Sequence, residues 1–389
     1  MTSARPIAAG IVTALVGFTS AFAVVLAGLS GVGATSGEAS SGLLAVSVTM
    51  GIASIILAVW TRKPITVAWS TPGAALLAAT GPVEGGWPAA VGAFALTGIL
   101  IVLTGLIRPL GRLIAAIPRS IAQAMLAGVL LPLCLWPVTG AVENPWAVLP
   151  VILVWLVALR FAPRWAVPLA FAAAVVVIAV HLATSGARIE PAALVPVVEL
   201  TVPTLSIGAV LGIALPLYLV TMASQNVAGV AVMRGLGYEV PWRASMVVTG
   251  VGTIIGAPAG GHAINLAAIS AALAAGPEAG EDRSRRWIAS VTSGVGVIVL
   301  GIASAAFVAI VLVAPAGVVP AVAGLALIAT LGSSISQAIE EPAERIPALA
   351  TFLVAASGIA VGGISAAFWA LVVGVVVRGA LIAFPRRRA

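Results

Sequence analysis

The chain has 389 residues, of which 61% are hydrophobic and only 8% are charged, and its formal net charge is +7. Soluble domains carry about a quarter charged residues, so this composition, with a mean hydropathy of +1.19, excludes an ordinary soluble protein. It predicts a polytopic, all-α membrane protein whose excess positive charge lies in cytoplasmic loops and does not form a nucleic-acid-binding surface.

Fourteen membrane elements are predicted from the apolar runs and the polar or Gly/Pro-rich stretches that separate them. The first seven cover residues 6–30, 39–60, 64–80, 87–107, 116–137, 145–160 and 164–184. A polar stretch at 185–205, which contains Glu190 and Glu199, is predicted to form an external loop. The second seven cover residues 206–233, 242–255, 257–276, 287–313, 318–339, 346–361 and 364–384.

The basic residues predict the orientation of these elements. If the N-terminus is cytoplasmic, only Arg188 of the 19 Lys and Arg residues falls outside, as the positive-inside rule requires. Both termini are therefore expected in the cytoplasm. The residues expected inside are Arg5, Arg62, Lys63, Arg108, Arg112, Arg119, Arg160, Arg164, Arg234, Arg243, Arg283, Arg285, Arg286, Arg345, Arg378, Arg386, Arg387 and Arg388.

The third element does not have the pattern of one continuous helix. Apolar residues alternate with small or polar ones over 65–70, which is typical of a strand. Ser70 and Thr71 can then cap a helix whose first turn accepts Pro72. The segment 64–78 is therefore predicted to be a strand followed by a half-helix that begins near mid-membrane. The alternative is an ordinary span kinked by proline.

A second broken segment is predicted at 256–265, with its helix continuing from about Gly261. The two halves of the chain also share short patterns, since Ala79–Pro82 is echoed by Ala275–Pro277. Seven elements are an odd number, so halves 1–184 and 206–389 are predicted to form an inverted repeat. Both half-helix N-termini, each with about half a positive charge, would then face one buried anion.

His262 is the main candidate for chemistry in the second broken segment. An ionisable side chain near mid-membrane is a functional hypothesis by default, whereas the alternative is a neutral histidine that bonds to backbone or to another helix. Gly261, at the predicted start of the half-helix, and Asn265, one turn after His262, complete this part of the predicted site.

Further hydrogen-bonding candidates lie in two other places. Ser70, Thr71 and Gly73 could donate to a carboxylate, or could only cap the half-helix. Gln225 and Asn226 interrupt an otherwise apolar element and could contact a ligand, or could only join helices.

Four aromatic residues are candidates to pack against a ring in the substrate. Trp69 lies at the predicted break between strand and half-helix, and the others are Phe18, Phe22 and Tyr218. Packing in the core or against lipid is the alternative for each phenylalanine.

Three stretches of the sequence resemble those of a known family. The stretch 64–77, PITVAWSTPGAALL, is similar to the signature of the bacterial benzoate:proton symporters, BenE, and so are 223–226 and 260–265. The resemblance implies the seven-plus-seven inverted-repeat fold of uracil permeases and of sulfate or bicarbonate carriers. That fold has a core domain, elements 1–4 and 8–11, and a gate domain, elements 5–7 and 12–14.

The resemblance also bears on the substrate. In nucleobase relatives, acidic residues of the eighth and tenth elements bind substrate, whereas Gln225, Asn226 and His262 stand in this region here. An anion is favoured over a nucleobase, because a glutamate beside a carboxylate would repel it.

The sequence thus predicts a secondary active transporter of the bacterial inner membrane that imports benzoate or a similar aromatic carboxylate with a proton, carried by His262. The alternatives are a nucleobase or inorganic-anion carrier of the same fold, or an anion channel. An enzyme is not expected, because the sequence has neither a cluster of residues with metal-ligand spacing nor a P-loop. No metal or other cofactor is expected, and the choice between monomer and homo-oligomer is left open.

Overall fold

The computed structural model describes residues 4–107, 109–111, 116–186, 189–362 and 364–383. Within these ranges, nine helices are long and apolar enough to cross a membrane, and Pro145–Phe161 is a shorter apolar helix. The predicted basic positions Arg108, Arg112, Arg188 and 386–388 lie outside the described residues.

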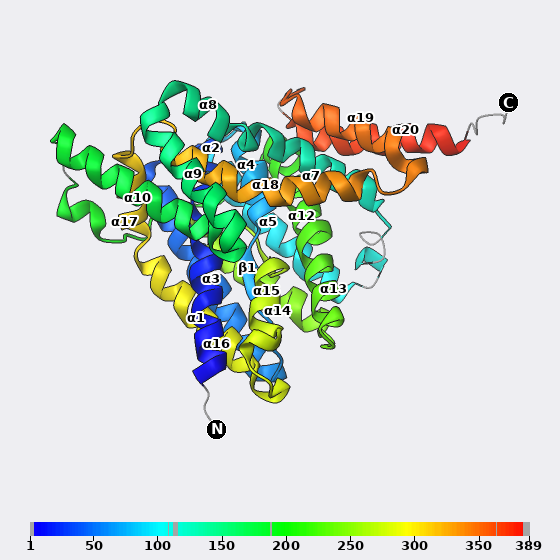
Figure 1. The fold of residues 1–389 in the computed structure, drawn as a ribbon. Coiled ribbons are helices and arrows are strands. Elements are labelled where there is room, and N and C mark those ends of the chain that lie inside the picture. The colour runs from blue at the N-terminus through cyan, green and yellow to red at the C-terminus, as the bar shows by residue number, and fades with distance from the viewer. Residues whose placement is uncertain (1–3, 108, 112–115, 187–188, 363, 384–389) are drawn as a thin grey trace.

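Figure 1 labels the helices and the strand of the first half of the chain. They are α1 (Ala4–Thr19), α2 (Phe22–Gly31), α3 (Ser36–Thr61), β1 (Val67–Trp69), α4 (Thr71–Thr80), α5 (Gly86–Leu106), α7 (Arg119–Cys134), α8 (Trp136–Glu143), α9 (Pro145–Phe161) and α10 (Ala166–Ser185). Two of the predicted elements contain a short break, the first between α1 and α2 and the fifth between α7 and α8.

The second half begins with a helix that contains two π-helical stretches. Its elements are α11 (Ile207–Ala209), η3 (Val210–Ala214), α12 (Leu215–Val220), η4 (Thr221–Asn226), α13 (Val227–Gly235), α14 (Trp242–Gly256), β2 (Ile264–Leu266), α15 (Ile269–Ala275), α16 (Trp287–Ile302), α17 (Ser304–Leu312), α18 (Val318–Ala338), α19 (Arg345–Ala356) and α20 (Ala366–Ala383). The predicted element 287–313 is divided between α16 and α17.

The two broken segments cross at a short antiparallel pair, in which β1 residues Val67, Ala68 and Trp69 lie opposite Leu266, Asn265 and Ile264. One further hydrogen bond extends the ladder at each end, from the Ser70 N–H to the Ala263 carbonyl and from the Ala267 N–H to the Thr66 carbonyl, both 2.9 Å. Non-helical backbone at membrane depth has to be satisfied by protein or water. Here the pairing satisfies the facing edges of the two strands. Side chains of neighbouring helices accept the outward N–H groups of Val67, Ile264 and Leu266.

The first broken segment agrees with the sequence prediction, whereas the second does not. The predicted strand and the helix start after Ser70 are both present. In the second segment the helix begins at Ile269 and not near Gly261. A turn at Gly260, with φ of 86°, leads through 261–263 into β2. Gly261, His262 and Asn265 therefore precede the half-helix, and Asn265 lies in a strand.

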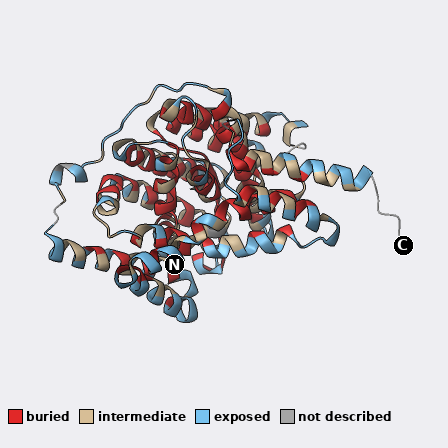
Figure 2. Cartoon of the chain, turned by 90° about the horizontal axis from the view of Figure 1, so that it is seen from above, coloured by how far each residue is buried: buried red, intermediate tan, exposed pale blue. Residues whose placement is uncertain are grey.

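The helices pack in two groups, and in the view of Figure 2 the buried residues concentrate in the middle of the molecule. In the first group α1–α5 pack with α14 and α16, and in the second α7–α10 pack with α18–α20. The second group contains an apolar cluster of its own, built from α9, α10 and α18 around Val148, Ala174 and Val322. That these groups are separate domains stays a prediction.

Polar contacts gather at the two ends of the helices. Near the C-terminal end of α3, Lys63 Nζ donates to the Glu239 carbonyl (2.6 Å). Arg164 pairs with Glu278 at the same end of the molecule. We call this end, marked by Lys63 and Arg164, the arginine-rich end. Near the N-terminal end of α3, the Ser41 hydroxyl bonds to the Glu199 carbonyl (3.2 Å). The second part of the predicted loop 185–205 is thus hydrogen-bonded to the helices. Here Trp87 Nε1 also donates to the Thr201 hydroxyl (3.0 Å).

Candidate functional site

A cavity of about 140 Å³ lies beside the crossing of the broken segments. Both groups of helices contribute to it, and no charged side chain is among its described lining residues. They are Thr13, Val16, Gly17, Ser20, Ala21, Met50, Thr66, Val67, Ala68, Trp69, Thr71, Pro72, Gln225, Ala267, Ala268, Ser270, Leu273, Ser293, Val297, Ala326 and Thr330.

The size and chemistry of the cavity suit a small, partly apolar ligand. An engineered apolar cavity of about 150 Å³ holds one benzene molecule, so this volume accommodates a single aromatic ring. Five polar side chains of the lining have no hydrogen-bond partner among the described residues, namely Thr71, Gln225, Ser270, Ser293 and Thr330. Among the described residues, no group of three His, Cys, Asp or Glu side chains is placed to hold a metal ion.

At the start of α4, the residue that caps the helix and the residue that lines the cavity are different. Ser70 is the N-cap, and its Oγ accepts the Gly73 N–H (3.2 Å) and the Thr221 hydroxyl (2.8 Å). Gly73 does not line the cavity; a Cβ there would meet Leu217 of α12 at 2.4 Å, so its lack of a side chain permits this close packing. Thr71, the residue after Ser70, lines the cavity.

Gln225 and Asn226 are neighbours in the π-helical stretch η4, but they face different surroundings. The Gln225 side chain lines the cavity. Asn226 is fully buried, its Oδ1 accepts the N–H of Leu266 in β2 (2.9 Å), and its Nδ2 lies 3.2 Å from the Met222 sulfur. Asn226 therefore fixes the strand, whereas Gln225 is free to contact a ligand.

His262, Gly261 and Asn265 lie behind the cavity and are absent from its lining. His262 is 1% exposed, with Nε2 3.3 Å from the Ser70 carbonyl oxygen. Asn265 Nδ2 donates to the Leu266 carbonyl (2.9 Å). Within the described ranges, neither His262 Nδ1 nor Asn265 Oδ1 has a hydrogen-bond partner. Gly261 packs against α3, where a Cβ would lie 3.2 Å from the Val46 nitrogen.

The aromatic candidates form a cluster next to the cavity. Trp69 lines the cavity, and its ring lies 5.2 Å from that of Phe18. Phe22 lies 4.9 Å from both Phe307 of α17 and Phe171 of α10, so the cluster bridges the two groups of helices. Tyr218, in contrast, is buried away from the cavity, and its hydroxyl bonds to the Thr104 hydroxyl of α5.

Several lining residues were missed by the sequence analysis, including Ser270, Ser293 and Thr330, and so were Phe171 and Phe307 of the aromatic cluster. Single hydroxyl and phenylalanine residues are common in membrane spans, and no local pattern distinguishes these from the others. They come from α10, α15, α16, α17 and α18, and only the tertiary packing of these helices brings them together.

Comparison with known proteins gives a consistent result. A family model described as benzoate membrane transport protein, BenE, matches residues 1–380. The chain is 37% identical to the inner membrane protein YdcO of Escherichia coli K12 over 94% of this chain and 93% of that protein. It is 31% identical to the benzoate membrane transport protein of Acinetobacter baylyi over 86% and 84%.

Solved structures with the same fold are more distant in sequence. The transmembrane domain of the cyanobacterial bicarbonate transporter BicA has a TM-score of 0.59 at 14% identity, covering 91% of this chain and 97% of that domain. SLC26A9 has a TM-score of 0.65 at 14% identity, covering all of this chain and 67% of that one. These likenesses establish a shared fold.

Proposed function

Because the chain belongs to the BenE family of benzoate membrane transport proteins, we propose that it carries benzoate or a similar aromatic carboxylate across the inner membrane together with a proton. The family consists of transporters and not of enzymes. The observation that carries the proposal is the uncharged cavity of about 140 Å³. Its wall contains the indole of Trp69 and polar side chains that have no hydrogen-bond partner among the described residues.

In this proposal the two ends of the substrate bind to different parts of the cavity. The ring packs against Trp69 and the apolar side chains of Met50 and Val297. The carboxylate lies at the start of α4 and accepts hydrogen bonds from Thr71 and Gln225. At this position the helix supplies about half a positive charge. An inorganic anion would use the same donors and leave the apolar wall uncovered.

Thr71→Val tests the carboxylate position, because it keeps the shape of the side chain and deletes the hydroxyl. Apparent affinity for benzoate should fall about tenfold or more, as expected for a hydrogen bond to a charged group worth about 1.5–3 kcal/mol. The half-saturating concentration would be measured in an uptake assay, with the amount of inserted protein checked. An unchanged value would leave Thr71 with a role in the helix only.

Transport is proposed to follow alternating access. We infer fourteen membrane elements arranged as a seven-plus-seven inverted repeat, in which α1–α5 and α11–α17 form the core domain and α7–α10 and α18–α20 the gate domain. The placement of the cavity supports this, since Ala326 and Thr330 of α18 face the broken segments across it. Movement of one group against the other would then expose the cavity to one side at a time.

A proton is proposed to accompany each carboxylate. An aromatic acid with a pKa of about 4 is an anion at neutral pH, and its entry into a cell with a negative interior costs about 2.3 kcal/mol per 100 mV. A co-transported proton removes this electrical cost.

Uptake into proteoliposomes tests the function directly. Benzoate should accumulate against its gradient when the outside is more acidic, whereas uracil and sulfate should not. Uphill uptake of uracil or sulfate would favour a nucleobase or inorganic-anion carrier. Benzoate flux that does not saturate and never exceeds equilibrium would identify a channel.

Both termini are proposed to lie in the cytoplasm, with the arginine-rich end of the molecule facing it. Cys134 is the only cysteine of the chain, so Glu84→Cys on a Cys134→Ser background provides a single label. This cysteine should react with a membrane-impermeant maleimide added outside intact cells. Reaction only from the cytoplasmic side would reverse the proposed orientation.

A further inference from the structure

A second cavity, of about 220 Å³, lies at the arginine-rich end of the molecule. It adjoins the central cavity, because Leu273 of α15 lines both. On α1, Val12 lines the second cavity and Thr13 lines the central one. The lining residues that matter here are Arg5, Val12, Arg164, Trp165, Leu273 and Glu278.

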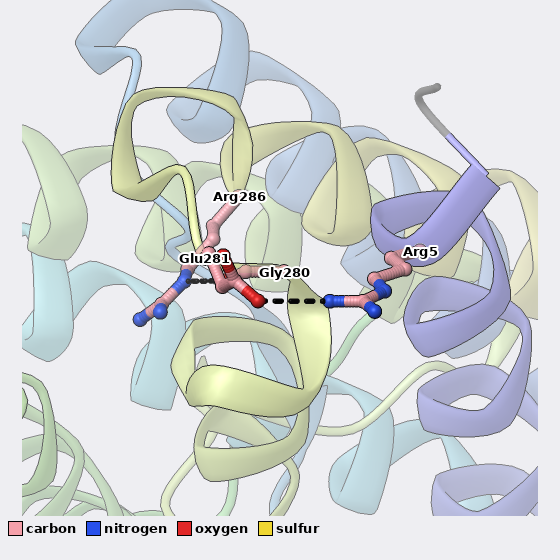
Figure 3. Close-up of polar contacts among 4 residues, drawn as sticks. All are labelled: Arg5, Gly280, Glu281 and Arg286. Atoms are coloured by element: carbon pink, nitrogen blue, oxygen red, sulfur yellow. Dashed lines mark hydrogen bonds and ion pairs between the residues drawn. The ribbon is translucent and has the colours of Figure 1, made fainter. Parts of the chain in front are cut away.

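The second cavity has the groups that recognise an aromatic carboxylate. Arg164 contacts both carboxylate oxygens of Glu278 through one nitrogen, at 3.0 and 3.1 Å. Arg5 makes only a long contact, 3.4 Å, with Glu281, whose side chain is 94% exposed (Figure 3). Guanidinium groups bind carboxylates by charge-assisted hydrogen bonds, and the Trp165 indole offers a surface for a ring.

The Arg164–Glu278 pair also connects the two groups of helices. Arg164 lies just before α10 in the second group, and Glu278 lies three residues after α15 in the first. The segment that carries Glu278 is held to α15 by Arg286, which is 8% exposed and donates to the carbonyls of Ala275 and Gly280, both at 2.8 Å. Figure 3 shows the contact with Gly280. Movement of Glu278 is therefore transmitted to α15, the half-helix that lines the central cavity.

We propose that this second cavity, the antechamber, is a transient binding site for the carboxylate substrate on the arginine-rich side of the central cavity, and that the Arg164–Glu278 pair is its latch. The substrate carboxylate replaces Glu278 on Arg164, and the two groups of helices are then free to separate. Both partners are 55% exposed, and such exposed pairs are weak enough for a competing carboxylate to displace. The identity of the substrate rests on the proposed function, whereas the latch does not.

Thiol labelling without substrate tests the latch. Thr13→Cys on a Cys134→Ser background places the label in the central cavity, and inside-out vesicles expose the arginine-rich side to a membrane-impermeant maleimide. Glu278→Gln and Arg164→Gln should each speed labelling about two- to fivefold, the population shift that loss of one exposed ion pair can bring. Glu281→Gln is the matched control and should label at the parent rate.

The charge-swapped variant, Arg164→Glu with Glu278→Arg, keeps a pair and should return labelling to the parent rate. Rates for Glu278→Gln and Arg164→Gln that equal that of Glu281→Gln would overturn the latch. Because labelling requires no transport, this result is independent of the benzoate assignment.

Benzoate exchange in proteoliposomes tests the binding site separately. With benzoate supplied on the arginine-rich side, Arg164→Gln should raise the half-saturating concentration about threefold or more, since it removes a charged donor. Glu278→Gln should lower it, because the competing carboxylate is gone. The same half-saturating concentration in both variants would overturn the antechamber as a substrate site.

Discussion

Asn226→Leu should reduce transport at least tenfold and lower the melting temperature of the protein, although Asn226 does not line the cavity. The substitution keeps the approximate shape of the side chain but removes the acceptor for the Leu266 N–H. Leaving a buried donor unpaired costs about 1–3 kcal/mol. The hydrogen bond that is lost holds β2, and β2 leads directly to Ala267 and Ala268 at the cavity wall. Thermal unfolding in detergent and benzoate uptake would measure the two effects.

Gln225→Leu is the matched control for this prediction. Gln225 is the preceding residue in the same π-helical stretch, and its amide has no partner among the described residues. Its loss should leave the melting temperature unchanged and raise the half-saturating benzoate concentration about tenfold. If both variants had the same effect on stability, the assignment of different roles to these two amides would be wrong.

His262→Asn should abolish benzoate accumulation driven by a pH gradient while exchange of labelled for unlabelled benzoate continues. We propose that Nδ1 of His262, which has no hydrogen-bond partner in the described part of the chain, accepts the transported proton. Its Nε2 contacts the carbonyl of Ser70, the N-cap of α4, so the added charge would lie beside the positive end of that helix. This is favourable only when an anion occupies the cavity, and proton and anion therefore promote each other's binding.

Parallel measurements of exchange and of pH-driven uptake in proteoliposomes would test this role. Full proton-coupled accumulation by His262→Asn would exclude it. The remaining explanations would then be transport of the protonated acid or a proton carried by water near the half-helix ends.

The two broken segments illustrate what a sequence can and cannot predict. The alternating pattern at 65–70 and the capping hydroxyl of Ser70 can be recognised from neighbouring residues, and the strand at 67–69 and the cap were both predicted correctly. The conformation of 261–266 depends on pairing with β1 in the other half of the chain. A local analysis therefore placed the helix start too early, at Gly261 in place of Ile269.

The same distinction applies to the site. Of the residues that the sequence analysis predicted to bind substrate, Trp69, Thr71 and Gln225 line the cavity. The other candidates do not line it, and the sequence could not separate the two sets. Gln225 and Asn226 are adjacent amides in an apolar element, and only the π-helical geometry decides which of them faces the cavity. Their roles in binding remain predictions.

The pairing of β1 with β2 has a consequence for how the protein is made. When the first broken segment leaves the ribosome, its partner strand has not yet been synthesised, since β2 lies in the second half of the chain. Unpaired backbone groups are costly in the hydrocarbon of a bilayer, so residues 64–70 have to stay in a watery or protein-lined environment, such as the insertion machinery, until β2 arrives. A fragment that ends before Ile264 should therefore remain a substrate for membrane proteases. Pairing of β1 with β2 in this way couples completion of the first broken segment to synthesis of the second half of the chain.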